Sequence, residues 1–225
     1  MESEVSRVLR PRSEARANYD RLSRWYDWVS APFERAAREQ GLELLDARPG
    51  EAVLEIGFGT GWALLSLADA VGPEGVVHGI DPSSGMLKIS HRRIRSHANA
   101  QIIGLSLGDA VWLPFGADCF DAAFMCFTLE LFDTPEIPRV MRECERVLRV
   151  GGRICVVSLS KSQNPAAVER VYERLHAAFP VAFDCRPIPV APSVSAGGFE
   201  LAADQAGSLW GLPVAIALAT KPDPI

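Results

Sequence analysis

Val53-Leu54-Glu55-Ile56-Gly57-Phe58-Gly59-Thr60-Gly61-Trp62-Ala63-Leu64-Leu65 is the stretch that decides the fold of this chain. A short apolar run with β-branched residues reaches three closely spaced glycines, and a second apolar stretch over residues 62–70 follows them. This order is typical of a buried strand, a tight turn and a helix. Such a turn brings backbone N–H groups and a helix N-terminus to the end of the strand, with no side chains in the way. It predicts a site for a nucleotide-like ligand.

The spacing of these glycines separates two classes of ligand. A dinucleotide-binding turn requires glycines at its first, third and sixth places. Counting from Gly57, the sixth place is occupied by Trp62, whose bulk opposes close packing of the helix on the strand. An NAD-dependent oxidoreductase is therefore disfavoured, and we keep it as one hypothesis. A purely structural turn is the other alternative for this stretch taken alone.

Composition excludes several classes of function. The 225 residues are 48% hydrophobic, which is enough for one domain with a full core. The formal net charge of −5 creates no overall basic field, so we expect no nucleic-acid partner. Five scattered cysteines without a Cys-x-x-Cys pair indicate reduced thiols in a cytoplasmic protein and no metal site. No apolar run is long enough for a membrane-spanning helix, and the first twenty residues do not resemble an export signal.

Beyond the glycine turn, strand-like and helix-like segments alternate. Strands are expected at residues 75–81, 101–107, 118–127, 154–159 and 214–220, and helices at residues 33–47, 83–97, 137–148 and 166–179. A short helix over residues 193–197 and a strand that begins at residue 199 complete the pattern. Alternation of this kind implies right-handed crossovers and a doubly wound, mostly parallel α/β sheet.

Two acids follow expected strands at the same edge of the sheet as the glycine turn. Asp81 closes the strand expected at 75–81 and lies twenty-four residues after Gly57, a spacing suited to binding ribose hydroxyls. Asp109 begins the loop after the next expected strand. Its alternative role is an Asx-turn, in which the carboxylate accepts a hydrogen bond from nearby backbone.

Short motifs follow one another over residues 50–160. They are Glu55-x-Gly57-x-Gly59-Thr60-Gly61, Asp81, Asp109-Ala110, Phe120-Asp121, Cys126-Phe127 and Arg146-Val147-Leu148-x-x-Gly151-Gly152. Together they resemble the class I S-adenosyl-L-methionine (SAM)-dependent methyltransferases of the ubiquinone and menaquinone methyltransferase type, with a methyltransferase type 11 domain. One departure is Val150, which stands where that family usually has proline.

This resemblance implies a Rossmann-like, seven-stranded sheet with an antiparallel last strand, and SAM as the cofactor with S-adenosyl-L-homocysteine as its product. Residues 57–61 would hold the methionine end, Asp81 the ribose, and Asp109 with Ala110 the adenine. The full set of cofactor-binding residues implied is Tyr19, Glu55, Gly57, Gly59, Thr60, Gly61, Asp81, Met86, Asp109, Ala110 and Cys126.

The N-terminal part of the chain, residues 1–48, is expected to form a helical extension. Positions 5 to 24 hold six arginines and two acids, interleaved with aromatic and aliphatic residues at helical spacing. We expect either a solvated helix packed on the core or a lid over the cofactor whose basic face contacts anionic lipid. The expected division is a lid over 1–48 and a methyltransferase domain over 49–225. The lipid contact would place the protein peripherally at the inner membrane face.

The methyl acceptor is the least determined part of this interpretation. By the resemblance we expect an apolar small molecule, either quinol-like or a lipid. Val157-Ser158-Leu159-Ser160 and Tyr26-Asp27-Trp28-Val29 depart from the quinone-methylating pattern and keep a phospholipid (phosphatidylethanolamine) N-methyltransferase open. A non-catalytic SAM-fold binding protein is the alternative from another class. A base could take the acceptor's proton, and the candidates are His176, Asp184 and Tyr172. The sequence leaves the oligomeric state open.

Overall fold

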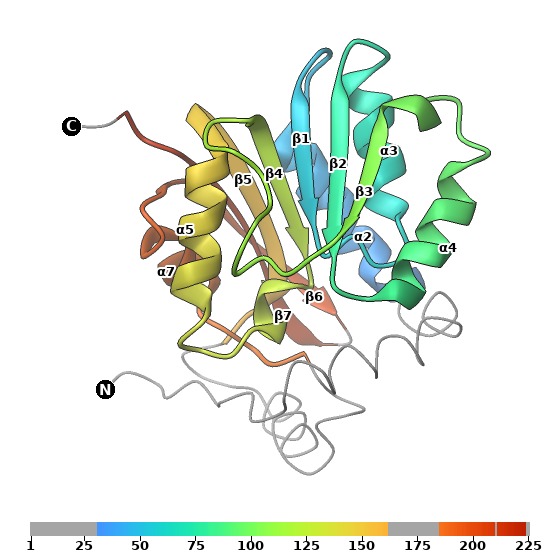
Figure 1. Cartoon of the computed structure of the whole chain (residues 1–225). Coiled ribbons are helices and arrows are strands. Elements are labelled where there is room, and N and C mark those ends of the chain that lie inside the picture. The colour runs from blue at the N-terminus through green and yellow to red at the C-terminus, as the bar shows by residue number, and fades with distance from the viewer. Residues whose placement is uncertain (1–30, 162–184, 210, 224–225) are drawn as a thin grey trace, which may run out of the picture.

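A seven-stranded sheet runs through the part of the protein that the computed structural model describes, which is residues 31–161, 185–209 and 211–223 (Figure 1). Its strands lie in the order β3-β2-β1-β4-β5-β7-β6. The first five pair in parallel, and β7 runs antiparallel to both of its neighbours, β5 and β6. This confirms the predicted fold class, including the antiparallel last strand. The bounds are β1 Ala52–Ile56, β2 Val76–Asp81, β3 Ile103–Leu107, β4 Phe120–Cys126, β5 Leu148–Leu159, β6 Glu200–Leu209 and β7 Leu212–Thr220.

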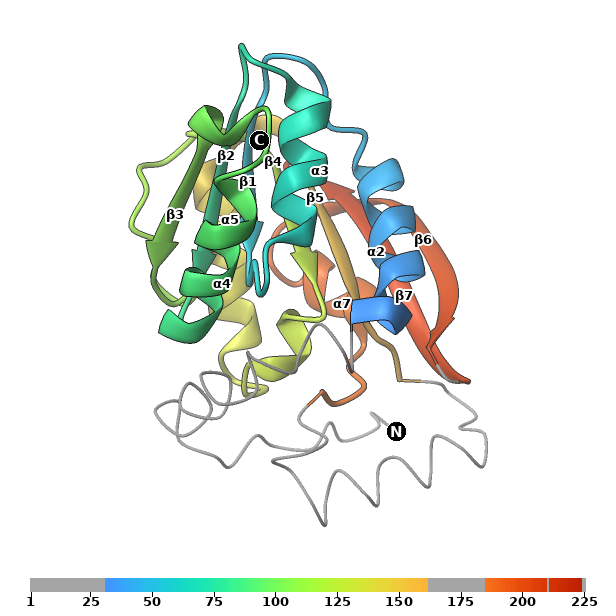
Figure 2. The ribbon, with the colours of Figure 1, turned by 90° about the vertical axis from the view of Figure 1, so that its right-hand side faces the viewer.

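Helices cover both faces of this sheet. The described ranges contain α2 (Ala31–Leu45), α3 (Trp62–Val71), α4 (Ser84–Ile94), α5 (Ile137–Val147) and α7 (Val190–Ser195), with short 3-10 turns η1 (Ala100–Ile102) and η2 (Leu129–Leu131). Figure 2 shows α2 and α3 in front of the sheet, with α4 on the same face, whereas α5 and α7 lie on the other. Each layer buries its own apolar cluster against the sheet. α5 shows why a helix packs on the sheet in this way. Its apolar residues recur at helical spacing, so they share one face, and all of them are buried.

Some bounds differ from the expected ones. β5 begins at Leu148 instead of residue 154, because Leu148 pairs with Phe120 and Arg153 with Ala122. The intervening residues of β5 are an irregularity in the ladder, with Gly151 at a φ of 73°. α4 ends at Ile94 and not at residue 97, and η1 takes the place of the first residues of the strand expected at 101–107. Hydrophobic periodicity does not report such interruptions.

α2 belongs to the helical layer, although it precedes the expected start of the core domain at residue 49. Leu45 is fully buried, and a β-carbon on Gly41 would approach Cγ2 of Val157 to 2.4 Å. Arg153 of β5 also donates to the carbonyl of Leu45 at 2.6 Å. The described part of residues 1–48 therefore packs on the sheet. Residues 1–30 lie outside the described residues, so the lid stays a prediction.

The strand order determines where a site can form. β1 lies between β2 and β4, and the three run in parallel, so their carboxyl ends meet at one edge of the sheet. Segments far apart in sequence are thereby brought together there. Of the helices in the described ranges, none is long and apolar enough to cross a membrane.

Candidate functional site

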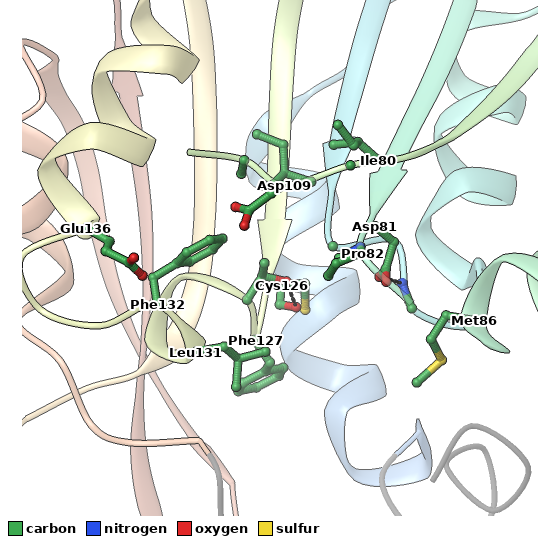
Figure 3. Close-up of a pocket in the computed structure, with 16 residues that line it drawn as sticks. Ile80, Asp81, Pro82, Met86, Asp109, Cys126, Phe127, Leu131, Phe132 and Glu136 are labelled. Atoms are coloured by element: carbon green, nitrogen blue, oxygen red, sulfur yellow. Dashed lines mark hydrogen bonds between the residues drawn. The ribbon is translucent and has the colours of Figure 1, made fainter. Parts of the chain in front are cut away.

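A pocket opens at the edge of the sheet where β1, β2 and β4 end. It has about 970 Å³ of empty space, including the part open to solvent. Figure 3 shows Asp81, Pro82 and Met86 on one side of the hollow and Phe132 and Glu136 on the other. The full lining is Ile56, Gly57, Gly59, Ile80, Asp81, Pro82, Met86, Gly108, Asp109, Ala110, Cys126, Phe127, Thr128, Leu131, Phe132 and Glu136. Open parallel sheets bind their ligands at this edge.

The glycine turn has a backbone conformation that glycine adopts at low cost. The φ angles of Gly57, Gly59 and Gly61 are 75°, 50° and 86°. A β-carbon on Gly57 would come within 2.3 Å of Oγ1 of Thr128, so this position must also be small. A β-carbon on Gly59 would have no atom within 4 Å, and Gly59 lines the pocket. The turn thus leaves open space beside its backbone for a ligand.

Asp81 lines the pocket and is held by two backbone amides. The N–H of Gly59 donates to Oδ2 at 3.0 Å, and the N–H of Ser83 donates to Oδ1 at 2.8 Å. The side chain is buried, with 7% of its surface exposed. A carboxylate is an acceptor of hydrogen bonds only, which is the chemistry that a ligand hydroxyl needs. Asp81 therefore ties the glycine turn to the end of β2 and places an acceptor in the lining of the pocket.

α4 supports the glycine turn through two side chains. The hydroxyl of Ser90 donates to the carbonyl of Gly59 at 2.8 Å, and the guanidinium of Arg93 donates to the carbonyl of Thr60. The central carbon of that guanidinium lies 4.0 Å from the ring centroid of Trp62. Trp62 is 44% exposed at the first position of α3, so its bulk does not press on the sheet.

Glu55 lies beneath the turn and does not line the pocket. Side chains alternate along β1, so Ile56 lines the pocket and Glu55 approaches α2 and α3 on the opposite face. Burial raises the pKa of Glu55 well above its ordinary value, against the opposing effect of Arg38. Asp81 adds to the rise, and a hydrogen bond from the N–H of Leu64 favours the charged form. The side chain of Glu55 thus lies at the first turn of α3, whose N-cap residue, Gly61, makes no side-chain hydrogen bond.

Asp109 combines the two roles considered for it. Its Oδ1 accepts a hydrogen bond from the N–H of Val111 at 3.1 Å, which is the Asx-turn interaction. It also lines the pocket together with Ala110, and Figure 3 shows its carboxylate facing the hollow. A carboxylate beside a small residue suits a planar ligand that carries an amine.

The segment after β4 forms an apolar wall of the pocket. Phe127 has a φ of 50°, a strained conformation for a bulky residue, and its N–H donates to the carbonyl of Val157 at 2.8 Å. The bend leads the chain into η2 and brings Leu131 and Phe132 to the pocket. Glu136, the N-cap residue of α5, adds an acidic side chain at the far end of this wall.

Two titratable groups near the pocket are shifted by burial. Burial raises the pKa of the Cys126 thiol well above its ordinary value, so it lines the pocket as a neutral group and not as a nucleophile. Burial also raises the pKa of Glu130 in η2 to about 8. The N–H of Leu159 donates to Oε1 of Glu130 at 3.4 Å, whereas Oε2 has no hydrogen-bond partner among the described residues.

The structure brings together seven of the predicted cofactor-binding residues, and three others lie next to the pocket without lining it. The seven are Gly57, Gly59, Asp81, Met86, Asp109, Ala110 and Cys126, and the three are Glu55, Thr60 and Gly61. Tyr19 and the candidate bases Tyr172, His176 and Asp184 lie outside the described residues. Binding by any of them stays a prediction.

Several lining residues were not predicted from the sequence. Ile80 and Pro82 flank Asp81, so the strand end that identified Asp81 could have identified them. Glu136 gave no signal, because it stands in a loop and reaches the pocket only through the way α5 is placed.

Comparisons with known proteins agree with this geometry. A protein-family profile described as "Methyltransferase domain" matches residues 53–152. A 2-phytyl-1,4-naphtoquinone methyltransferase of Synechococcus elongatus is 35% identical over 147 residues, which cover 65% of this chain and 61% of the relative. The chain thus spans about three fifths of the length of that relative. The protein of the same description from Trichormus variabilis is 30% identical over 156 residues, which cover 68% of this chain and 67% of that protein.

A solved structure is similar in fold. It is the geranyl diphosphate methyltransferase in complex with SAM, with a TM-score of 0.67 and 15% sequence identity. The match covers 83% of this chain and 84% of that one. At this identity the likeness shows the shared fold.

Proposed function

Because the chain belongs to the class I SAM-dependent methyltransferases, we propose that it transfers a methyl group from SAM to an apolar, quinol-like acceptor. The observation that carries the proposal is the composition of the pocket. Polar groups at the ends of β1, β2 and β3 form one side, and the apolar segment after β4 forms the other. The first side suits a nucleoside-like cofactor and the second an apolar acceptor.

The residues present fit SAM in their chemistry. SAM has ribose hydroxyls that need acceptors, and Asp81 places a carboxylate in the lining of the pocket. The adenine amine needs an acceptor too, and Asp109 is suited to that role. The methionine end of SAM needs space beside backbone that carries no side chain, and the turn provides such space at Gly59. SAM carries no pyrophosphate, which agrees with a turn that has Trp62 where a dinucleotide turn has glycine.

In this mechanism the protein mainly positions the reactants and excludes water. SAM when bound supplies an activated methyl group for an in-line displacement, so no protein nucleophile is required. Asp81 and Asp109 would orient the cofactor, and the glycine turn would support its methionine end. Phe127, Leu131 and Phe132 would hold an apolar acceptor and keep water from the transferred methyl.

The quinol-like acceptor is supported by two observations. The relatives from Synechococcus elongatus and Trichormus variabilis are described as methyltransferases of a phytyl naphthoquinone, which is an apolar ring. On the acceptor side of the pocket, Phe127, Leu131 and Phe132 provide aromatic and aliphatic surface that suits such a ring, with Glu136 at the far end of the wall. The thiol of Cys126 is neutral and does not add a charge beside it.

Ligand binding tests the cofactor part of the proposal. Isothermal titration of the full chain with SAM, S-adenosyl-L-homocysteine and NAD should show binding of the first two and none of NAD. Gly59→Val should lose SAM binding, and Gly151→Val should retain it. Gly151 is the matched control because it also has positive φ and open space around its β-carbon position. Binding of NAD in preference to SAM would overturn the proposal.

Product analysis tests the acceptor. A reduced 1,4-naphthoquinone with an apolar side chain, incubated with SAM and the full chain, should gain one methyl group by mass spectrometry. Phosphatidylethanolamine vesicles should gain none. Methylation of the phospholipid alone would replace the proposed acceptor by the alternative one. SAM binding without transfer to either acceptor would favour a non-catalytic SAM-binding protein.

A further inference from the structure

The distribution of charge singles out one segment away from the pocket. Residues 82–108 contain four lysines and arginines and no acid, in a chain whose formal net charge is −5. This segment forms α4, η1 and β3, and β3 is the edge strand of the sheet. One side of the molecule is therefore locally basic, although the whole chain is acidic.

A groove lies between α4 and this edge of the sheet. Its floor is aliphatic and consists of Leu87, Ile94, Ala100, Ile103 and Leu105. Figure 1 shows α4 beside β3 at the end of the sheet opposite to β6. An apolar floor at a surface suits a ligand that has an apolar part.

The rim of the groove is basic. Lys88, His91, Arg92 and Arg95 line it, and all four side chains are exposed. They recur at spacings of three and four along α4 and its C-cap residue, Arg95, which places them along one side of the helix. We call Lys88, Arg92 and Arg95 the rim cations.

The described residues do not neutralise the rim cations. Near the groove, His97 lies 3.4 Å from Asp69. No ion pair between described residues involves a rim cation. Arg93, the remaining arginine of α4, points instead to the glycine turn through Thr60 and Trp62. The rim thus presents positive charge to the solvent above an apolar floor.

The combination distinguishes between partners. A single-stranded nucleic acid would need aromatic side chains for its bases to stack on. Among the described residues that line the groove there is His91 but no Phe, Tyr or Trp. The N-terminal residues 5–24 carry six arginines and two acids, so their charge does not complement the rim. An anionic phospholipid matches both parts, since its phosphate pairs with the rim cations and its acyl chain with the floor.

We propose that the groove between α4 and β3 is a docking surface for an anionic phospholipid membrane. The proposal concerns binding and does not depend on methyl transfer. Met86 of α4 lines the pocket, and the next residues, Leu87 and Lys88, line the groove. A membrane held at the groove therefore lies beside the entrance of the pocket, and an apolar acceptor dissolved in the membrane would have a short path to it.

Vesicle co-sedimentation of the full chain tests the docking surface. The chain should bind vesicles of phosphatidylglycerol and phosphatidylcholine, and binding should fall when salt is raised. The triple variant Lys88→Glu, Arg92→Glu, Arg95→Glu should bind at least about tenfold more weakly, since each basic residue near an anionic surface contributes about 1 kcal/mol. Pure phosphatidylcholine vesicles should bind neither protein.

A matched control separates this surface from general charge. The triple variant Arg35→Glu, Arg48→Glu, Arg142→Glu changes the net charge equally at exposed positions outside the groove, and it should bind within about twofold of the unaltered chain. Equal losses in both triple variants would overturn the proposal and would point to the arginines of residues 1–30 or to net charge.

Two further measurements keep the outcome decisive. Titration with SAM should give the same affinity for the rim variant and the unaltered chain, because no rim cation lines the pocket. If the rim variant unfolds, Lys88→Gln with Arg92→Gln should still bind anionic vesicles at least about fivefold more weakly. Inorganic phosphate and a single-stranded oligonucleotide should not compete at concentrations that leave the fold intact, and competition by the oligonucleotide would replace the membrane by nucleic acid.

Discussion

The two ends of the sheet use the same kind of strand for different purposes. Toward the β3 end of the sheet, β1, β2 and β4 are five to seven residues long. β1 stops before Gly57, β2 at Asp81 and β4 before the bend at Phe127, and their last residues line the pocket. At the other end, β6 and β7 are ten and nine residues long and pair along almost their full length. The first end exposes backbone and carboxylates for binding, whereas the second uses its backbone groups in the ladder. The cofactor pocket of this fold therefore lies where strands stop and not along the long ladder of β6 and β7.

The largest expected effect is a loss of SAM binding when the glycine at the pocket, Gly59, is replaced, compared with a similar replacement of Gly151 in β5. Gly59→Val should abolish SAM binding, because a branched side chain would fill the open space at the pocket. Gly151→Val, at a φ of 73° in β5, should bind SAM normally although it carries similar backbone strain. Both should lose about 1–3 kcal/mol of unfolding free energy. Calorimetric titration and thermal melts measure the two quantities, and equal SAM affinity in both variants would show that the turn does not hold the cofactor.

A second prediction concerns Glu130, which lies where the two regions meet. Its folded pKa of about 8 exceeds the ordinary value of 4.5, with burial as the largest cause and Glu34 adding to the rise. The folded protein therefore keeps this proton over a range in which the unfolded chain has lost it. The contribution of Glu130 to stability is fully present below pH 4.5 and is lost as pH rises toward 8.

Glu130→Gln should remove this loss, because an amide does not titrate. The variant should gain on the order of a few kcal/mol relative to the unaltered chain between pH 5 and pH 9, measured by urea unfolding. Glu200→Gln, at an exposed acid of β6, should leave the pH profile unchanged. If the unfolding free energies of Glu130→Gln and of the unaltered chain changed with pH in parallel, the raised pKa of Glu130 would be contradicted.

A smaller effect is expected for Asp81. Asp81→Ala should weaken SAM binding by about 1.5–3 kcal/mol, which is roughly 10- to 150-fold, because hydrogen bonds to a charged acceptor are lost. Asp204→Ala, at an exposed acid of β6, should have no effect on the same titration. An unchanged affinity in a folded Asp81→Ala protein would exclude Asp81 from the site.

The smallest expected effect comes from removing single serine hydroxyls. It tests whether Ser90 holds the glycine turn in place for SAM binding or only stabilises the fold. Ser90→Ala removes the hydroxyl that donates to the carbonyl of Gly59 at 2.8 Å, and should cost about 1 kcal/mol of stability and about fivefold in SAM affinity. Ser193→Ala removes a similar bond, to the carbonyl of Pro189 at 2.7 Å in α7, and should cost stability only. The pair is measured by thermal melts and SAM titration, and a loss of affinity in both would mean that the turn responds to general destabilisation.

The glycines and acids at the ends of β1, β2 and β3 could be predicted from the sequence, because each of these residue types meets a specific structural requirement there. Gly57 and Gly59 are required by positive φ, and the acids Asp81 and Asp109 follow strands, so their place at the edge could be inferred. The strain at Phe127 could not be inferred, because phenylalanine is a common strand residue and its φ depends on the bond to β5.

Arg186 illustrates the same limit. It is fully buried and donates to the carbonyl of Phe132 at 2.6 Å and to the hydroxyl of Thr134 at 3.1 Å. Arginine is rarely buried, so nothing local predicts this connection. These two bonds exist only because Arg186, which is 54 residues from Phe132 and 52 from Thr134 in sequence, folds back onto the loop before α5.

The sequence by itself determined the alternation of strands and helices, the glycine turn and the acids at strand ends, because periodicity and backbone conformation are local properties. The tertiary structure alone decided which of these residues share a pocket. Ile56 and Glu55 are neighbours in β1, and only the position of the sheet between its two helical layers sends the first to the pocket and the second beneath α3. It also raised the pKa of Glu130, since burial is a property of the packed molecule and not of the residue.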